Sequence, residues 1–185
     1  MIVDIGGGTT EIAVIALGGI VCDKSIRIAG DDFTANIEEY MRRQHNILIG
    51  ERSAERVKIE VGAALTELEN PPQDYAVHGR DLMTGIPKEI HVSYVEIAHA
   101  LDKSIAKIEE AILNALEMTP PELSADIFRT GIYLAGGGSL LRGLDKRISM
   151  KTKLPVHIAE DPLRAVARGT GIALKNIHKF PFLIK

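Results

Sequence analysis

The sequence has a single cysteine, Cys22, no tryptophan and only 4% aromatic residues. A lone cysteine excludes an intramolecular disulfide framework and favours a reducing compartment. Neither sign of charge dominates, because 22 Lys and Arg residues stand against 25 Asp and Glu residues. Since nucleic-acid-binding proteins need a basic surface to neutralise phosphates, this balance argues against a nucleic-acid partner.

Long apolar runs are also missing. No stretch reaches the ~18 uncharged apolar residues that a membrane-spanning helix needs, and the amino terminus has no basic region followed by an apolar segment. The 185 residues, 45% hydrophobic and 25% charged, have the proportions of a globular protein. That length accommodates one large domain or two small ones. Because Met1 leads directly into a strand-like run, we expect a preceding half of the protein upstream of it.

Hydrophobic periodicity predicts a mixed α/β fold. Three strand-like runs joined by glycine turns open the chain and predict an antiparallel meander. Further along, apolar spacings of three and four residues predict helices, and Gly and Pro residues mark the breaks between them. The predicted elements are strands at 2–5, 11–17 and 20–28, helices at 33–41 and 50–61, a hairpin at 75–92, a helix at 95–116, a strand at 132–135, a helix at 139–150, a strand at 155–159 and a helix at 162–174.

The strongest chemical signal is the run Asp-Ile-Gly-Gly-Gly-Thr-Thr-Glu at residues 4–11. A strand delivers a carboxylate to its end, and three glycines then allow backbone N–H groups to converge on an anion such as phosphate. A strand follows these glycines, which excludes a Walker loop and the dinucleotide fingerprint. Asp4 could hold Mg²⁺ through water, while Thr9 and Thr10 supply hydroxyl donors. A tight hairpin whose glycines only permit positive φ is the alternative, and spacing does not decide between the two.

A second glycine run, Gly136-Gly137-Gly138-Ser139, follows a strand-like segment and precedes a helical one. The partial positive charge at a helix amino terminus, with no side chains in the way, suits an anion or the ribose and base of a nucleotide. A close strand-to-helix turn explains the same residues without a ligand. Two glycine loops at strand ends of one sheet together favour nucleotide binding.

Other candidates have weaker support. Glu55, Arg56 and Lys58 lie in a charged run that is typical of a solvated helix face with i,i+4 ion pairs. The six histidines have no metal-ligand spacing, and the motifs Gly-x-Ser-x-Gly and His-Glu-x-x-His of hydrolases are missing. The apolar tail at 180–184 could contact lipid or a partner, although a packed or frayed terminus is the simpler explanation.

Four segments, taken together and in chain order, resemble a known family of proteins, although no single one of them is specific to it. They are Asp-Ile-Gly-Gly-Gly-Thr-Thr-Glu at 4–11, Ala-Glu-Arg-Val at 54–57, Ala-Gly-Gly-Gly-Ser-Leu-Leu at 135–141 and Glu-Asp-Pro-Leu-Arg-Ala-Val-Ala-Arg-Gly-Thr-Gly at 160–171. In combination they resemble the actin and heat-shock chaperone ATPase superfamily, and within it the bacterial MreB family of rod-shape-determining proteins. The resemblance covers the whole chain, but only the carboxyl-terminal lobe of a two-lobed family.

The resemblance implies a ribonuclease-H-like mixed sheet flanked by helices, the fold of an actin-like ATPase lobe. Residues 1–45 and 94–185 are expected to form this subdomain, and residues 46–93 an inserted small α+β subdomain that contacts the next filament subunit. The first phosphate loop, the first connecting helix and the membrane-inserting segments of the other lobe have no counterpart here. We therefore expect ATPase activity only in the full two-lobed protein, because hydrolysis needs a γ-phosphate held from both sides.

The resemblance also assigns roles within a site for ATP and Mg²⁺. Residues 4–11 match the second phosphate loop, with Asp4 near the metal as the one catalytic candidate. Residues 54–57 match the contacts to ribose and base, 136–139 the adenosine loop, and 165–171 the second connecting helix. The nucleotide-binding residues implied are Gly6, Gly7, Gly8, Thr9, Thr10, Ala54, Glu55, Arg56, Val57, Gly136, Gly137, Gly138 and Ser139.

The function implied is that of a bacterial actin-like cytoskeletal ATPase, which forms membrane-associated filaments and maintains rod cell shape by organising cell-wall synthesis. Its expected partners are further subunits of the same filament, cell-wall elongation proteins and membrane-associated shape proteins. Membrane contact would come through the missing lobe, at a cytoplasmic location beneath the inner membrane. Two alternatives stay open, a lobe of a sugar kinase or chaperone-type ATPase and a nucleotide-free interaction module of the same fold.

Overall fold

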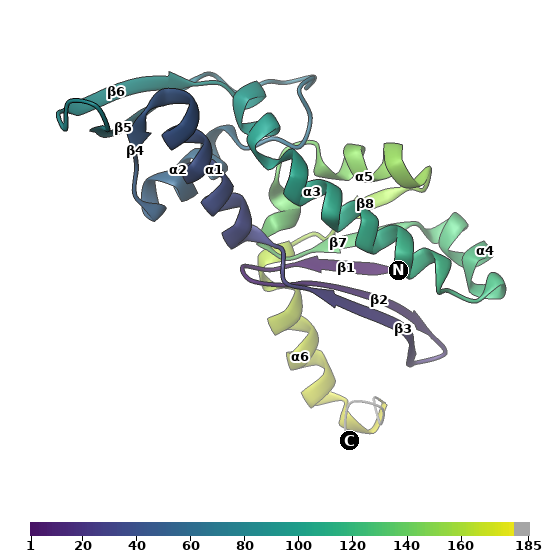
Figure 1. Cartoon of the computed structure of the whole chain (residues 1–185). Coiled ribbons are helices and arrows are strands. Elements are labelled where there is room, and N and C mark those ends of the chain that lie inside the picture. The colour runs from purple at the N-terminus through teal and green to yellow at the C-terminus, as the bar shows by residue number, and fades with distance from the viewer. Residues whose placement is uncertain (180–185) are drawn as a thin grey trace.

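The computed structural model describes residues 1–179, which contain two separate sheets and the helices packed on them (Figure 1). The tail at 180–184, for which a packed or frayed terminus was expected, lies outside these residues. The strands are β1 (Ile2–Ile5), β2 (Thr10–Ala16), β3 (Gly19–Ile26), β4 (Ile47–Leu48), β5 (Tyr75–Asp81), β6 (Pro87–Val92), β7 (Ile132–Ala135) and β8 (Val156–Ile158). The helices are α1 (Gly30–His45), α2 (Glu51–Val61), α3 (Tyr94–Glu117), α4 (Pro121–Thr130), α5 (Leu144–Thr152) and α6 (Ala165–Lys175).

The larger sheet has the strand order β3-β2-β1-β7-β8. Its first three strands pair antiparallel, as the glycine turns predicted, whereas β7 runs parallel to both β1 and β8. Side chains alternate along β2, so that Ile12 and Val14 are buried while Glu11 and Ile15 are exposed. The predicted mixed sheet flanked by helices is therefore confirmed.

Helix α3 packs on β2 and β3, α5 packs on β8, and α1 lies between α3 and α2. The long helix forms because its apolar residues recur at the 3.6-residue period, and they end up on one fully buried face. Ser93 and Glu96 form a capping box at its start. The buried face consists of Ile97, Leu101, Ile105, Ile108 and Ile112.

The smaller sheet, with the order β4-β5-β6, and α2 both belong to the segment 46–93 (Figure 1). The predicted hairpin at 75–92 is confirmed as β5 and β6, which pair antiparallel. Val77 and Val92 of this sheet are buried in the same hydrophobic cluster as the residues under the larger sheet. The inserted segment thus has its own sheet but shares its core with the rest of the described chain.

Three features of the fold differ from the prediction. Strand β4 was missed because two residues are too short to show a period, and α4 was missed because its prolines were interpreted only as a stop. Pro121 instead occupies the first turn of α4, where a missing N–H costs nothing. The helix predicted at 139–150 is confirmed only from residue 144 as α5, because Gly137–Leu140 forms a 3₁₀ turn and Gly143, with a φ of +74°, precedes the helix.

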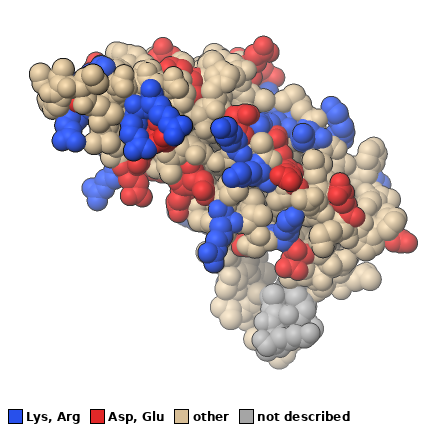
Figure 2. Space-filling view, in the orientation of Figure 1, with Lys and Arg blue, Asp and Glu red and all other residues tan. Residues whose placement is uncertain are grey.

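The last helix, α6, extends away from the larger sheet (Figure 1), and none of its residues is buried. Short 3₁₀ turns precede and follow it, at Pro162–Arg164 and Ile177–Lys179. Within residues 1–179, no helix combines the length and the apolar character needed to cross a membrane. On the face that Figure 2 shows, acidic and basic side chains are interleaved rather than gathered by sign.

The loop after β7 lies directly on the end of β1. Gly136 has a φ of +79°, and a Cβ at this position would overlap the backbone oxygen of Ile5 and the carboxylate of Asp4. A Cβ at Gly138 would overlap the side chain of Ile5. The second glycine run is therefore in contact with Asp4 and Ile5, which lead into the first run, and this contact requires residues without side chains.

We expect Gly136→Ala to lower the free energy of unfolding by more than about 2 kcal/mol, because it combines a strained φ with a backbone overlap. Gly169→Ala is the matched control, since a Cβ at Gly169 in α6 meets nothing within 4 Å. The control should leave stability unchanged or raise it by about 0.5–1 kcal/mol. Urea denaturation of the three proteins measures this, and equal midpoints would contradict the close loop packing.

Candidate functional site

Both glycine loops and α2 line one cavity of about 940 Å³. Gly6 and Gly7 come from the loop after β1, and Gly137 and Gly138 come from the loop after β7. Glu55 and Arg56 of α2 were the third predicted group, and they line the same cavity. A volume of this size is typical of a site for a small molecule or cofactor. The structure thus brings together the two glycine loops, which the sequence pattern had connected, and α2, which only the resemblance had connected to them.

Gly6 and Gly7 lie close to their neighbours but do not have unusual backbone angles. None of Gly6, Gly7 and Gly8 is among the positive-φ glycines of the described chain, so the alternative explanation by positive φ is wrong, although β1 and β2 do form a hairpin. A Cβ on Gly7 would lie 3.3 Å from the Asp31 carboxylate. The carbonyl oxygens of Gly6 and Gly7 accept hydrogen bonds from Gly30 N (3.0 Å) and Asp31 N (2.8 Å). The start of α1 therefore holds this loop in place.

A charged network connects α2 to the start of α1. Lys58 Nζ lies 2.6 Å from Glu55 Oε2 and donates hydrogen bonds to Gly30 O (2.8 Å) and Thr34 Oγ1 (3.0 Å). Thr34 in turn donates to the same Glu55 oxygen (2.7 Å). The Lys58 side chain is only 15% exposed, so the predicted solvated face is wrong for this residue. All three ammonium protons have acceptors inside the protein.

Glu55 is ionised in this network. Burial by itself raises the pKa of its carboxyl, but the hydrogen bonds from Lys58 and Thr34 and the charge of Lys58 outweigh burial and lower the pKa below its usual value. Both bonds go to Oε2, and within residues 1–179 no hydrogen bond goes to Oε1. Glu55 lines the cavity, and its Oε1 is therefore available as a further acceptor.

Several cavity residues were not identified as site residues from the sequence, and Lys58 and Asp31 are two charged ones among them. Lys58 occupies a position between Ala54, Val57 and Val61 on the buried stripe of α2, and a lysine within an apolar stripe was the signal that could have found it. Asp31 gave no comparable signal, because acidic residues are ordinary in a first helical turn. Its neighbour Asp32 provides the cap, accepting from Ala29 N (2.9 Å), whereas Asp31 lines the cavity.

Asp4 does not line the cavity, but its carboxylate lies against Gly136 where the two loops touch. Glu11 is its partner across the antiparallel pair of β1 and β2. Burial raises the pKa of Asp4, and the negative charge of Glu11 raises it further. The carboxylate predicted to sit at the end of β1 is therefore at the junction of both loops.

The other predicted nucleotide-binding residues do not place their side chains in the cavity. The buried hydroxyls of Thr10 and Ser139 donate to backbone oxygens, Ile28 O and Gly136 O, each at 2.7 Å. Gly136 packs against Asp4 and Ile5 at the end of β1, and the four residues that remain do not line the cavity either. These remaining residues are Gly8, Thr9, Ala54 and Val57.

The residues around the loops fit a water-mediated Mg²⁺ ion better than a directly chelated metal. Among residues 1–179, no three His, Cys, Asp or Glu side chains gather into a metal-binding group. Mg²⁺ keeps several waters and takes only one or two carboxylates when phosphate oxygens complete its shell. Asp4 and Asp31 lie at the two glycine loops and supply that number of carboxylates.

Comparison with known proteins gives concordant matches. A model of the MreB/Mbl protein family matches residues 1–181. The cell shape-determining protein Mbl of Bacillus subtilis is 46% identical over 98% of this chain, and the chain spans about half, 54%, of that protein's length. The crystal structure of MreB 5 of Spiroplasma citri bound to AMPPNP superimposes with a TM-score of 0.91 and 43% identity, over 96% of this chain and 53% of that one.

A more distant structural neighbour is described as a MamK double helical filament. Its TM-score is 0.70 and its identity is 26%, over 88% of this chain and 50% of that chain. Together with the MreB 5 structure it establishes the actin-like fold that the sequence segments predicted.

We expect Lys58→Met to lower the free energy of unfolding by about 2 kcal/mol, because it leaves Glu55 and Gly30 O without their buried donor. Lys58→Arg should restore part of the loss, since a guanidinium keeps the charge and the donors. Lys107→Met, at an exposed position on α3, is the control and should have little effect. If the variants at 58 and 107 unfold at the same urea concentration, the network does not hold α2.

The lowered pKa of Glu55 predicts how acid affects α2. A carboxyl whose pKa is lower in the folded state stabilises the protein above its unfolded value of 4.5, and this contribution disappears as the pH falls through the lower folded pKa. Glu55→Gln should therefore be less stable than the parent at pH 7, and the difference should shrink below about pH 4.5. Denaturation series at several pH values measure it, and a difference independent of pH would contradict the ionised network.

Proposed function

This chain belongs to the MreB/Mbl protein family, and on that premise we propose that it is one lobe of a bacterial actin-like cytoskeletal ATPase and binds Mg-ATP between α2 and the two glycine loops. The observation that carries the proposal is the single cavity lined by Gly6 and Gly7, by Glu55 and by Gly137. The AMPPNP in the related MreB 5 structure supports a nucleotide as the ligand.

Each wall of the cavity has a separate task in this proposal. The loop with Gly6 and Gly7 binds phosphate oxygens through backbone N–H groups, which approach closely because no side chain intervenes. Glu55 Oε1 accepts a ribose hydroxyl, and the guanidinium of Arg56, exposed at the cavity wall, stacks on the base. Asp4 and Asp31 would hold Mg²⁺ through its waters, and the bound metal would neutralise phosphate charge.

Catalysis requires the other lobe. Hydrolysis depends on a water held in line with a γ-phosphate that is fixed from both sides, and this chain supplies one side. Since the chain spans about half the length of its relatives, we assign turnover to the two-lobed protein. In that protein, ATP would favour closure of the lobes and hydrolysis would relax it, a population shift driven by differential binding.

The cellular role follows from the family. We propose that the two-lobed protein forms filaments of identical subunits beneath the inner membrane, with membrane contact through the other lobe, and that these filaments organise cell-wall synthesis together with elongation and membrane-associated shape proteins. The filament described for MamK supports self-association. A sugar kinase lobe is disfavoured by the family match, whereas a nucleotide-free interaction module is an alternative that a binding experiment separates.

Titration of the 185-residue chain with Mg-ATP should give weak binding, with a dissociation constant well above the low micromolar range, and no release of phosphate. Glu55→Ala should weaken binding by about tenfold, the effect of losing one charge-assisted hydrogen bond. Glu117→Ala, at an exposed position at the end of α3, is the control and should bind like the parent.

Low-micromolar affinity would contradict the division of the site between two lobes. No heat at millimolar Mg-ATP would contradict nucleotide binding by this lobe and favour the interaction module. Sedimentation of the two-lobed protein with and without ATP tests the filament proposal, and pelleting that is the same in both conditions would contradict nucleotide control of assembly.

A further inference from the structure

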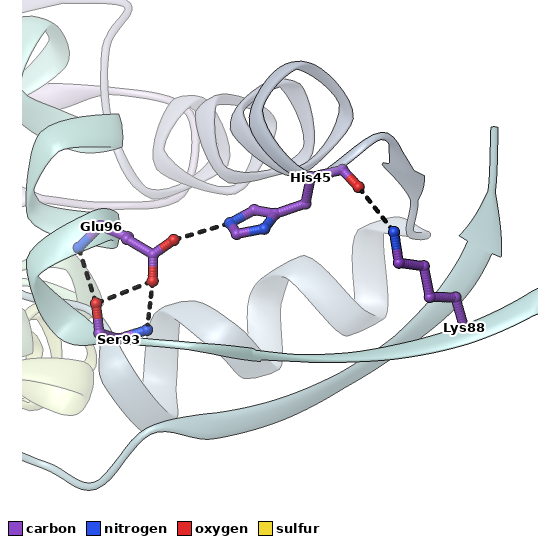
Figure 3. A network of polar contacts seen from close by, with 4 residues as sticks. All are labelled: His45, Lys88, Ser93 and Glu96. Carbon is purple, nitrogen blue, oxygen red and sulfur yellow. Dashed lines mark hydrogen bonds and ion pairs between the residues drawn. The ribbon is translucent and has the colours of Figure 1, made fainter. Parts of the chain in front are cut away.

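The chain leaves α1 at His45 and enters the segment 46–93. It leaves this segment at Ser93, the residue before α3. A polar network joins these two crossing points, and Figure 3 shows its four residues in a row. Asn46 turns the chain out of α1 with a φ of +51°. The place where the inserted sheet is attached is therefore held by side chains as well as by the two connections.

Glu96 uses its two carboxylate oxygens for different elements. Oε2 accepts hydrogen bonds from Ser93 N and from the Ser93 hydroxyl, both at 2.9 Å, and completes the cap of α3. Oε1 accepts from His45 Nε2 at 2.8 Å, at the end of α1. The cap thus fixes the carboxylate before His45 binds it, so this bond costs less side-chain entropy than an exposed ion pair does.

Lys88 adds the inserted sheet to the same network. Its Nζ donates to His45 O (3.3 Å), one of the carbonyls at the end of α1 that has no helical partner. The same ammonium pairs with Asp81 across the β5 and β6 hairpin (3.2 Å). The last residue of α1 is therefore tied to α3 by its ring and to β6 by its backbone.

The charges around the network are consistent with an ionised Glu96. Burial alone raises the pKa of this carboxyl, but the bonds from Ser93 and His45 lower it further than burial raises it. Burial and the negative charge of Glu96 both raise the pKa of Tyr40, whose ring centroid lies 5.9 Å from that of His45. The side chains of His45 and Glu96 are 23% and 31% exposed, so water screens the pair only in part.

The network is outside the cavity but is connected to it through α1. The first turn of α1 contacts the loop with Gly6 and Gly7 and receives the Lys58 bond, while its last residue is His45. Helix α2, which forms one wall of the cavity, packs along α1 and next to β5. A change of angle between α1 and the inserted sheet would therefore move α2 relative to the glycine loops.

We infer that His45 and Glu96 form a clasp at the attachment of the inserted sheet, which positions α2 against the two glycine loops and so sets the nucleotide affinity of the cavity from outside it. Both act as positioning residues, since neither lines the cavity. The inference rests on the proposed nucleotide binding, and it adds the contacts that hold α2 in place as a wall of the site.

Three variants of the 185-residue chain test the clasp. His45→Ala removes the ring nitrogen, His45→Gln keeps an N–H donor near the same place, and His78→Ala is the matched control. His78 forms a comparable pair with Glu89 (2.6 Å), but that pair is exposed and joins only β5 and β6. Mg-ATP affinity is measured by titration calorimetry, and opening of α2 by amide hydrogen exchange without nucleotide.

We expect His45→Ala to weaken Mg-ATP binding by about fivefold and to speed exchange of the α2 amides. His45→Gln should restore most of the affinity, and His78→Ala should match the parent in both measurements. A purely structural role would lower the melting temperature of His45→Ala but leave its affinity, measured well below that temperature, equal to the parent's. That result, or loss of affinity in His78→Ala as well, overturns the inference.

The outcomes also separate this inference from the proposed function. If the parent chain does not bind Mg-ATP at all, nucleotide binding by this lobe is contradicted, while the exchange data still judge the clasp as an anchor of α2. If His45→Ala does not fold, His45→Leu replaces it, because it also lacks the ring nitrogen that binds Glu96, and unchanged α2 exchange in the variant used contradicts the clasp. Binding in the parent with equal affinity in all variants overturns the positioning role alone.

Discussion

The loop after β7 can rest on the end of β1 only because positions 136 and 138 carry no side chain. Gly137 and Gly138 line the same cavity as Gly6 and Gly7, and the Asp4 carboxylate lies against the second loop. The parallel pairing of β1 and β7 makes this arrangement possible, because the loops that follow these two strands leave at the same end of the sheet. Helices α1 and α2 form further walls of the cavity.

Buried or half-buried charged side chains join neighbouring helices at two places in the structure. Lys58 satisfies acceptors on α1 from its position on α2, and Arg147 of α5 binds Glu109 of α3 at 2.9 Å with both side chains largely buried. The desolvation of Arg147 lowers its pKa, but its bonds to Glu109 and Asp102 raise it above the ordinary value. Such pairs contribute less to stability than apolar packing does, yet removing one partner leaves an uncompensated buried charge. They therefore fix how the helices are oriented.

The sequence predicted the larger features of this fold because they depend on periodicity and on glycine. The apolar period of α3 and the glycine turns between β1, β2 and β3 were sufficient to place those elements. The interruption at Gly143 was missed, because a run of apolar residues on both sides of it looks continuous until a positive φ is imposed. Within the site, the glycine loops were predictable, since a missing side chain shows in the sequence. The network of Lys58, Thr34 and Glu55 was not, because only the packing of α2 on α1 turns an ordinary charged face inward.

The single hydrophobic cluster that joins both sheets has a consequence for how the chain unfolds. Val77 and Val92 under the small sheet and Val57 on α2 belong to the same cluster as Ile12 and Ile105 under the large one. Within residues 1–179 the two sheets share this one core, so they are expected to unfold together rather than one after the other. An insertion that could be excised without loss of the remainder would need a core of its own, and the segment 46–93 instead completes the core of the sheet from which it departs.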